Sequence, residues 1–184
     1  MTKVTTLKDR IVNEIAPALK EKLGKKTTMA VPKITKIVVN VGIGRFKEDK
    51  KAVEEIVKNV VLLSGQKPVI SRARMAISNF KLRAGQPVGI CTTLRGENMY
   101  HFLNKFINVI CPRIRDFRGF SERSFDGNGN LSIGIREHTV FPEVPPADAN
   151  KIHGLQITFH TSATNDADAL ELFKSLSFPF RKQS

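Results

Sequence analysis

The chain is organised around a basic stretch, residues 67–95, which reads KPVISRARMAISNFKLRAGQPVGICTTLR. From Lys58 to Arg95 the sequence holds seven Lys or Arg side chains and no Asp or Glu. The pattern predicts two extended limbs around a middle of small residues, because side chains alternate between the two sides of a strand. The cationic side chains then share one side of each limb: Arg72 and Arg74 on the outgoing limb, and Lys81 and Arg83 on the returning limb, opposite Phe80 and Leu82.

This uncompensated charge has two interpretations. Charged side chains on an exposed hairpin can simply block edge-to-edge aggregation of strands. Alternatively, the charge meets an anionic partner, and arginine is well suited to phosphate and to stacking on bases. Because charge that blocks edges usually mixes Glu with Lys, and this stretch has no acidic residue, we favour the anionic partner.

The whole chain is basic, and the charge is unevenly distributed. Its formal net charge is +13. Residues 1–118 hold 24 basic and 9 acidic side chains, a net of +15, whereas residues 119–184 hold 6 and 8, a net of −2. Such an excess points to nucleic acid or an anionic membrane surface. The partner is therefore expected to meet the first two-thirds of the chain.

The length of 184 residues, 41% of them hydrophobic, predicts one domain over residues 1–184. Within it we expect an N-terminal helical segment, residues 1–30, and a basic arm with adjoining strands, residues 67–95. Apolar periodicity predicts helices over 6–23 (kinked or restarted at Pro17), 49–63, 99–110 (ended by Pro112) and 170–176. Strands are predicted over 31–41, 131–141 and 155–161. The expected fold class is α+β, with a largely antiparallel sheet, helices packed on one face, and an extended basic hairpin or loop arm.

Membrane insertion, metals and cofactors find no support in the sequence. No apolar run approaches the roughly 20 residues of a membrane span, and the N-terminus lacks a hydrophobic signal core, so we expect an intracellular protein. We interpret the two cysteines, Cys91 and Cys111, as reduced core residues. The four histidines show no metal-ligand spacing, and we interpret them as structural. The glycines after the first strand lack the third glycine of a dinucleotide fingerprint, because Lys47 stands there. We expect no metal and no cofactor.

Two rival classes of function have weaker support. An enzyme could use Asp116 and Asp126 as acid and base, but ion pairing and turn capping explain these carboxylates better, and no nucleophile motif accompanies them. A membrane-surface protein could lay its basic first helix on anionic lipid, but acidic residues on that helix weaken the attraction. We therefore expect neither enzymatic activity nor membrane binding.

A second cationic segment follows the 99–110 helix. Residues 112–119 read PRIRDFRG and interleave Arg113, Arg115 and Arg118 with apolar Ile114 and Phe117. These three arginines are additional candidates for RNA contact.

Six motifs in order resemble the ribosomal protein five family of the bacterial large subunit, over nearly the whole chain. They are SGQKP (64–68), ISNFKLR (77–83), TLRG (93–96), PRIRDFRG (112–119), SFDG (124–127) and FPFRK (178–182). The resemblance implies a cytoplasmic, ribosome-bound protein. Its partners would be 5S rRNA, 23S rRNA, P-site tRNA, other proteins of the central protuberance and a head protein of the small subunit.

The resemblance also assigns roles to individual positions. It implies 5S rRNA contact for Asn40, Gln66, Phe80 and Thr93, with Lys67 and Arg95 beside them as phosphate candidates. It places the arm near tRNA, through Arg72, Arg74, Ser78, Lys81 and Arg83. Amide side chains can read base edges or ribose hydroxyls, and a phenylalanine can stack on an unpaired base. The alternative for Phe80 is burial within the sheet. The family often has Lys-Ser where this chain has Met75-Ala76, so we expect the arm tip to hold phosphate less tightly.

Overall fold

The computed structural model describes residues 6–46, 49–145 and 152–181. The helices are α1 (Leu7–Arg10), α2 (Ala16–Lys22), α3 (Lys50–Ser64), α4 (Gly96–Lys105), α5 (Cys111–Arg113) and α6 (Asp166–Ser175). Two π-helical segments are η1 (Ile11–Ile15) and η4 (Phe106–Ile110). Short 3-10 turns are η2 (Thr28–Ala30), η3 (Ser78–Phe80), η5 (Glu122–Ser124) and η6 (His138–Val140). The strands are β1 (Ile34–Gly42), β2 (Val69–Arg72), β3 (Pro87–Leu94), β4 (Leu131–Ile135) and β5 (Leu155–Thr161).

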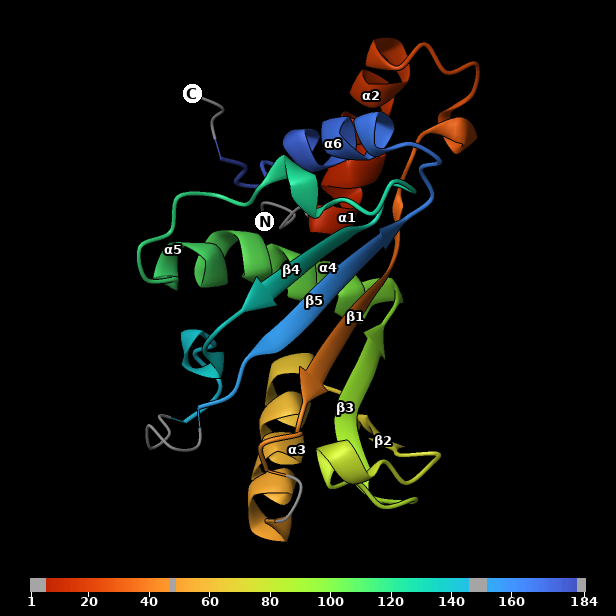
Figure 1. The fold of residues 1–184 in the computed structure, drawn as a ribbon. Coiled ribbons are helices and arrows are strands. Elements are labelled where there is room, and N and C mark those ends of the chain that lie inside the picture. Colours follow the sequence, from red (N-terminus) through yellow and green to blue (C-terminus); the bar gives the residue numbers. More distant parts are fainter. Residues whose placement is uncertain (1–5, 47–48, 146–151, 182–184) are drawn as a thin grey trace. The chain divides into compact units, whose positions relative to one another are not determined.

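The five strands form one sheet in the order β2-β3-β1-β5-β4, and neighbouring strands run in opposite directions (Figure 1). This confirms the predicted α+β class with an antiparallel sheet. In β2 and β3, Val69 pairs with Cys91 and Ser71 with Gly89, and the register shifts after Ser71. The buried positions of β1 are Ile34 and then Ile37, so the alternation slips by one residue near the start of that strand.

The chain forms two compact units. Unit 1 comprises residues 1–37, 95–133 and 158–184, and unit 2 comprises residues 38–94 and 134–157. Strands β1, β4 and β5 each pass from one unit into the other. The assignment of the whole chain to a single domain stays a prediction.

Two helices of unit 1 each accommodate a proline after a π-helical segment. The predicted N-terminal helix consists of α1, the π-helical η1 and α2, with Pro17 near the start of α2. The second consists of α4, the π-helical η4 and α5, with Pro112 in α5. Proline lacks an N–H and collides with the carbonyl four residues earlier, so a widened turn before it lets the helix continue. The prediction for Pro17 is confirmed. The prediction that Pro112 ends its helix is wrong, because the helix continues to Arg113.

The core of unit 1 is aromatic. Phe106, wholly buried on η4, lies 5.4 Å from the ring of Phe159 on β5 and 5.8 Å from the ring of Phe178. Phe173 on α6 packs edge-on against Phe159 and Phe178, at 5.9 and 5.3 Å. Such pairs add to the hydrophobic gain from the buried area itself. The phenylalanines of the predicted helices, Phe102, Phe106 and Phe173, are therefore core residues.

Unit 2 has an aliphatic core beneath helix α3. Asp49 caps this helix by accepting hydrogen bonds from the backbone N–H groups of Lys51 and Ala52, at 2.9 and 3.2 Å. Gly65, with φ of 67°, ends it in the left-handed conformation that glycine adopts readily. The helix buries Val53, Ile56, Val60 and Leu63, and the strands of the unit bury Val39, Val41, Ile90 and Leu94.

A further sequence prediction needs correction. The strand predicted over residues 131–141 ends at Ile135, and η6 follows instead of continued strand. Asn165 occupies the N-cap position of the last helix, but its side chain makes no capping hydrogen bond. Instead Asp166 accepts hydrogen bonds from the N–H groups of Gly127 and Gly129, at 3.1 and 2.8 Å, which fixes the turn before β4 against the start of α6.

Candidate nucleic-acid interface

The exposed face of the strands in unit 2 is polar. Alternation buries Val39, Val41, Ile90 and Leu94 on one side, and so turns Asn40 of β1 and Thr93 of β3 to the exposed side. Gly89 lies next to Asn40: a Cβ at this glycine would stand 3.9 Å from the Asn40 Oδ1 atom and 3.5 Å from the Val41 carbonyl oxygen. Gly89 therefore lies in contact distance of the Asn40 side chain on the neighbouring strand.

Gln66 and Lys67 follow helix α3 in a turn that Ser64 holds. The Ser64 hydroxyl donates to the Val60 carbonyl, and it also accepts from the backbone N–H of Gln66 at 3.3 Å. With the left-handed Gly65 between them, this fixes the path of the chain where the SGQKP motif leaves the helix. Gln66 is half-buried and Lys67 is exposed. The motif is therefore a structural turn that presents these two side chains.

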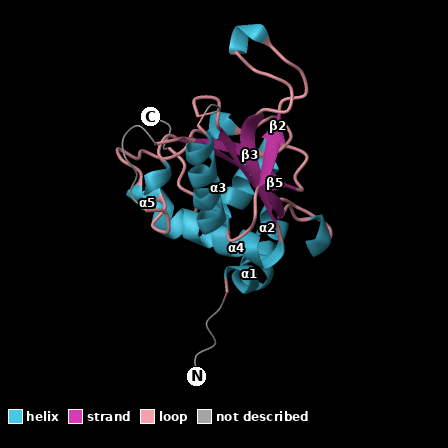
Figure 2. Ribbon diagram, turned by 90° about the horizontal axis from the view of Figure 1, so that it is seen from below, coloured by secondary structure: helices cyan, strands magenta, loops and turns pink. Residues whose placement is uncertain are grey.

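The basic stretch forms a loop, residues 73–86, between β2 and β3 (Figure 2). Its own backbone holds it: Ala73 donates to Gln86, and Ile77 and Leu82 exchange hydrogen bonds of 3.0 and 3.1 Å. The predicted alternation over the returning limb is wrong, because residues 78–80 make a 3-10 turn and Lys81 has φ of 49°. Strand resumes only at Pro87.

The side chains of this loop are nearly all exposed. Phe80 is 67% exposed, so it is not buried within the sheet. Ser78 and the charged side chains Arg74, Lys81 and Arg83 are exposed as well. Arg72, at the end of β2, is exposed and donates to the Gly85 carbonyl at 3.2 Å. The structure therefore groups an exposed aromatic ring and three cations on one loop of unit 2, with a fourth cation, Arg72, at the end of the strand that leads into it.

The remaining arginine candidates belong to unit 1. Arg113, Arg115 and Arg118 are exposed, and Arg95 occupies the N-cap position of α4. The segment that carries the three arginines is tied to the C-terminal FPFR segment: Phe120 donates to Pro179 and accepts from Arg181, each at 2.9 Å. The conformation of Gly119 permits this approach, since a Cβ there would lie 2.6 Å from the Phe180 carbonyl carbon. Two motifs 60 residues apart thus form one structure.

The carboxylates considered for catalysis have structural roles. Asp126 accepts from the backbone of Asn128 and Asn130, and from the Asn130 amide at 2.7 Å. The Asn130 side-chain bond is the main cause that lowers the pKa of Asp126. Asp116 is exposed and lies 3.8 Å from the Arg115 guanidinium. The predicted roles in turn capping and ion pairing are confirmed.

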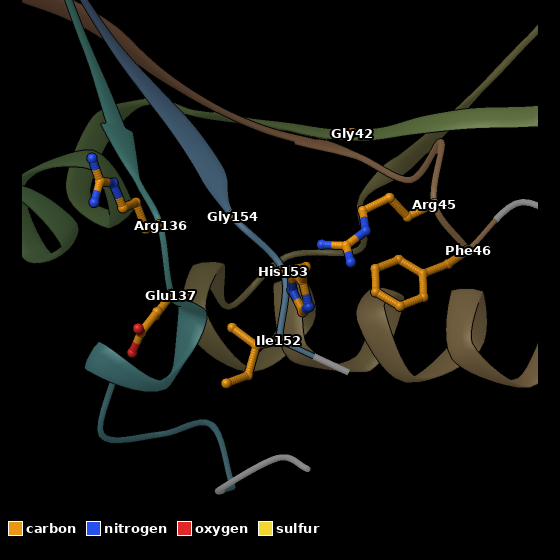
Figure 3. A pocket seen from close by; sticks show the side chains of 8 residues that line it. All are labelled: Gly42, Arg45, Phe46, Arg136, Glu137, Ile152, His153 and Gly154. Atoms are coloured by element: carbon orange, nitrogen blue, oxygen red, sulfur yellow. The ribbon is translucent and has the colours of Figure 1, made fainter. Parts of the chain in front are cut away.

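Unit 2 also has a cavity of about 350 Å³. In it the Arg45 side chain points toward His153, whereas Arg136 and Glu137 point away (Figure 3). The His153 ring stacks on that of His138 at 3.9 Å, and both are buried. Burial lowers the pKa of His138, whose Nδ1 accepts from the His153 backbone N–H at 3.3 Å. Because the charged groups do not converge, the cavity does not assemble an acid–base pair.

The four histidines differ more than their sequence suggested. His138 and His153 are core residues, as expected, but His101 is exposed on α4 and His160 is half-exposed on β5. Cys111 is buried, and burial raises the pKa of its thiol to about 12, so it is inert at neutral pH. Cys91 is half-exposed on β3, and its core assignment is therefore wrong.

Family models match most of the chain. The model described as ribosomal protein L5 matches residues 27–83, and the model for the C-terminus of the same ribosomal family matches residues 87–180. The chain belongs to the ribosomal protein L5 family. The large ribosomal subunit protein uL5 of Halothermothrix orenii is 50% identical over 97% of this chain and all of that relative. The uL5 proteins of Alkaliphilus oremlandii and Chloroflexus aggregans are 47% and 48% identical, over 96% and 95% of this chain and 98% and 97% of theirs.

The family membership confirms the resemblance drawn from the six motifs. No helix in residues 6–46, 49–145 or 152–181 is long and apolar enough to cross a membrane. The relatives are named as ribosomal proteins, which accords with a structural rather than an enzymatic role. The individual RNA contacts stay predictions.

Proposed function

We propose that this protein is a structural component of the large ribosomal subunit, where it binds 5S rRNA and attaches it to 23S rRNA in the central protuberance. Membership of the ribosomal protein L5 family supports the assignment to the large subunit and to the cytoplasm. The observation that carries RNA binding is the basic loop of unit 2, which exposes Phe80 and lies within a stretch, Lys58 to Arg95, that contains no acidic residue.

The 5S site would lie in unit 2 and use three kinds of contact. Asn40 and Thr93 offer hydrogen bonds from the exposed strand face, and Gln66 offers an amide from the turn after α3. Phe80 offers a ring for stacking on an unpaired base. Lys67 would neutralise phosphate, and Arg95 of unit 1 is a further phosphate candidate.

The same loop would face P-site tRNA through Arg72, Arg74, Ser78, Lys81 and Arg83. Met75 and Ala76 stand at its tip and carry no charge, so phosphate contacts there fall to the flanking cations. Arg113, Arg115 and Arg118 of unit 1 are exposed candidates for further rRNA contacts, including 23S rRNA. The remaining partners in this proposal are other proteins of the central protuberance and a protein of the small-subunit head.

Titration of 5S rRNA with the full chain and with Asn40→Ala tests the 5S site. The Asn→Ala change should weaken binding by about 1–3 kcal/mol, as expected for a lost specific hydrogen bond. Asn59→Ala, on helix α3, is the matched control and should bind like the wild type. Normal binding by a folded Asn40→Ala protein contradicts the site, and no binding by the wild type contradicts the function.

A separate experiment distinguishes the tRNA-facing loop from the 5S site. Replacing Arg72, Arg74, Lys81 and Arg83 by Gln should lower tRNA retention on reconstituted subunits and leave the salt dependence of 5S binding unchanged. If these four cations belong to the 5S site instead, the slope should fall by roughly 0.7–0.9 log units per lost phosphate contact.

A further inference from the structure

Unit 1 carries a small cationic cluster formed by Lys36, Arg95 and His160, of which the motifs singled out only Arg95. Lys36 lies on β1 and His160 on β5, where the Thr35 hydroxyl donates to the His160 carbonyl at 3.1 Å. The alternation slips between Ile34 and Ile37, so Lys36 lies on the side of β1 opposite to the buried Ile37. His160 likewise lies on the side of β5 opposite to the buried Phe159. Arg95 directly follows β3, which is the other neighbour of β1 in the sheet, and its charge acts on the same imidazole.

The charges around His160 are predominantly positive. Burial is the main cause that lowers its pKa, and Lys36 and Arg95 lower it further, while Asp126 acts in the opposite direction. Asp126 is held in its turn by the Asn130 amide and by two backbone N–H groups, which are neutral donors and leave its charge in place. Among the described residues, neither Lys36 nor Arg95 makes an ion pair within 4.0 Å. Two cations and one carboxylate therefore leave the surroundings of His160 with an excess of positive charge.

We propose that Lys36, Arg95 and His160 form a phosphate-binding cluster for the backbone of 5S rRNA, in which His160 takes up a proton when the RNA binds. The proposal rests on the proposed function, and it adds Lys36 and His160 to the contacts expected from the resemblance. Negative charge brought close to a half-exposed imidazole that has two cations nearby favours its protonated form. An RNA phosphate supplies that charge and matches the lysine and arginine beside it.

Proton uptake makes RNA affinity depend on pH in a defined direction. The phosphodiester keeps its charge near neutrality, so the change must come from the imidazole. A bound-state pKa above the free-state pKa means that affinity rises as the pH falls through that interval. Each unit of difference between the two pKa values changes the affinity tenfold.

The experiment is a filter-binding titration of 5S rRNA at about pH 6 and about pH 8, at one salt concentration, with three full-length proteins. Wild type should bind several-fold more tightly at the lower pH. His160→Gln should lose this difference. His101→Gln, which removes an exposed histidine of the same unit, should retain it. Urea denaturation at both pH values establishes that every protein is folded.

Lys36→Gln supplies an independent readout. Losing one phosphate contact should lower the slope of log affinity against log salt by about 0.7–0.9. If His160→Gln keeps the full pH difference, the proposal is wrong, although 5S binding itself stands. An unchanged salt slope for Lys36→Gln also contradicts the proposal. If both variants bind 5S rRNA normally but fail to join reconstituted subunits, the cluster faces a protein and the proposal is wrong. Absence of 5S binding by the wild type contradicts the proposed function instead.

Discussion

Two phenylalanines show the contrast between the aromatic core of unit 1 and the basic loop of unit 2. Phe106 is 0% exposed and stacks or packs edge-on with Phe102, Phe120, Phe159 and Phe178. Phe80 is 67% exposed, on a loop held by its own backbone hydrogen bonds. Phenylalanine thus stabilises the fold in the core of unit 1. In the loop of unit 2 the ring is exposed to solvent and contributes little to the free energy of unfolding.

The largest expected effect is on folding. Phe106→Ala removes a wholly buried ring and leaves a cavity, so the free energy of unfolding should fall by about 3–5 kcal/mol. Phe80→Ala is the matched control and should change it by less than about 1 kcal/mol. Urea denaturation followed by circular dichroism measures both. If the two variants lost equal free energy of unfolding, the distinction between core and loop would be wrong.

Two glycines sharpen the same comparison. Gly119 and Gly85 both have positive φ, 91° and 83°, so alanine at either position costs about 1–2 kcal/mol. Of the two, Gly119 is the one where the new Cβ would also meet backbone atoms, at 2.6 Å, whereas at Gly85 no atom of the described residues lies within 4 Å of it. Gly119→Ala should therefore lower the free energy of unfolding by about 3 kcal/mol or more. An equal cost at both positions, in the same denaturation assay, would show that the approach to the C-terminal segment is unimportant.

A smaller effect is expected from the stacked histidines of unit 2. Burial lowers the pKa of His138 in the folded state, so below the ordinary histidine value of about 6.5 the unfolded chain binds a proton that the folded chain does not. Stability should therefore fall as the pH drops below that value, by at most about 1.4 kcal/mol per pH unit for one proton. Denaturation midpoints between about pH 7 and pH 5 measure this. His138→Gln should show a weaker pH dependence, and an unchanged one contradicts the assignment.

Much of the fold could be predicted from periodicity. The strand over residues 155–161 and the helix over 49–63 match β5 and α3 closely, because both have regular burial and clear end signals. The end of β4 at Ile135 could not be predicted, because residues 136–141 are still rich in residue types that favour strands. In the structure, tertiary packing places η6 there instead. The widened turns before Pro17 and Pro112 left no signal beyond the prolines themselves.

The candidate site divides in the same way. The positive charge of the basic loop could be predicted from the sequence, because a stretch without acidic residues is a property of composition. The shape of the loop was not, because the left-handed Lys81 is an uncommon conformation that no residue type there indicates. The cluster at His160 depends on strand register and on the slip in β1, which bring together residues 36, 95 and 160. Pairings over such distances along the chain have no local signature.

The most direct test of the account measures two properties of Phe80→Ala together, its affinity for 5S rRNA and its urea midpoint. The account predicts binding weaker by about 1–3 kcal/mol, the value of one stacked base, with a midpoint close to that of the wild type. Wild-type affinity would contradict the role of the exposed ring in RNA binding. A large drop in the midpoint would show that the ring serves the fold, and would contradict the separation of core from loop.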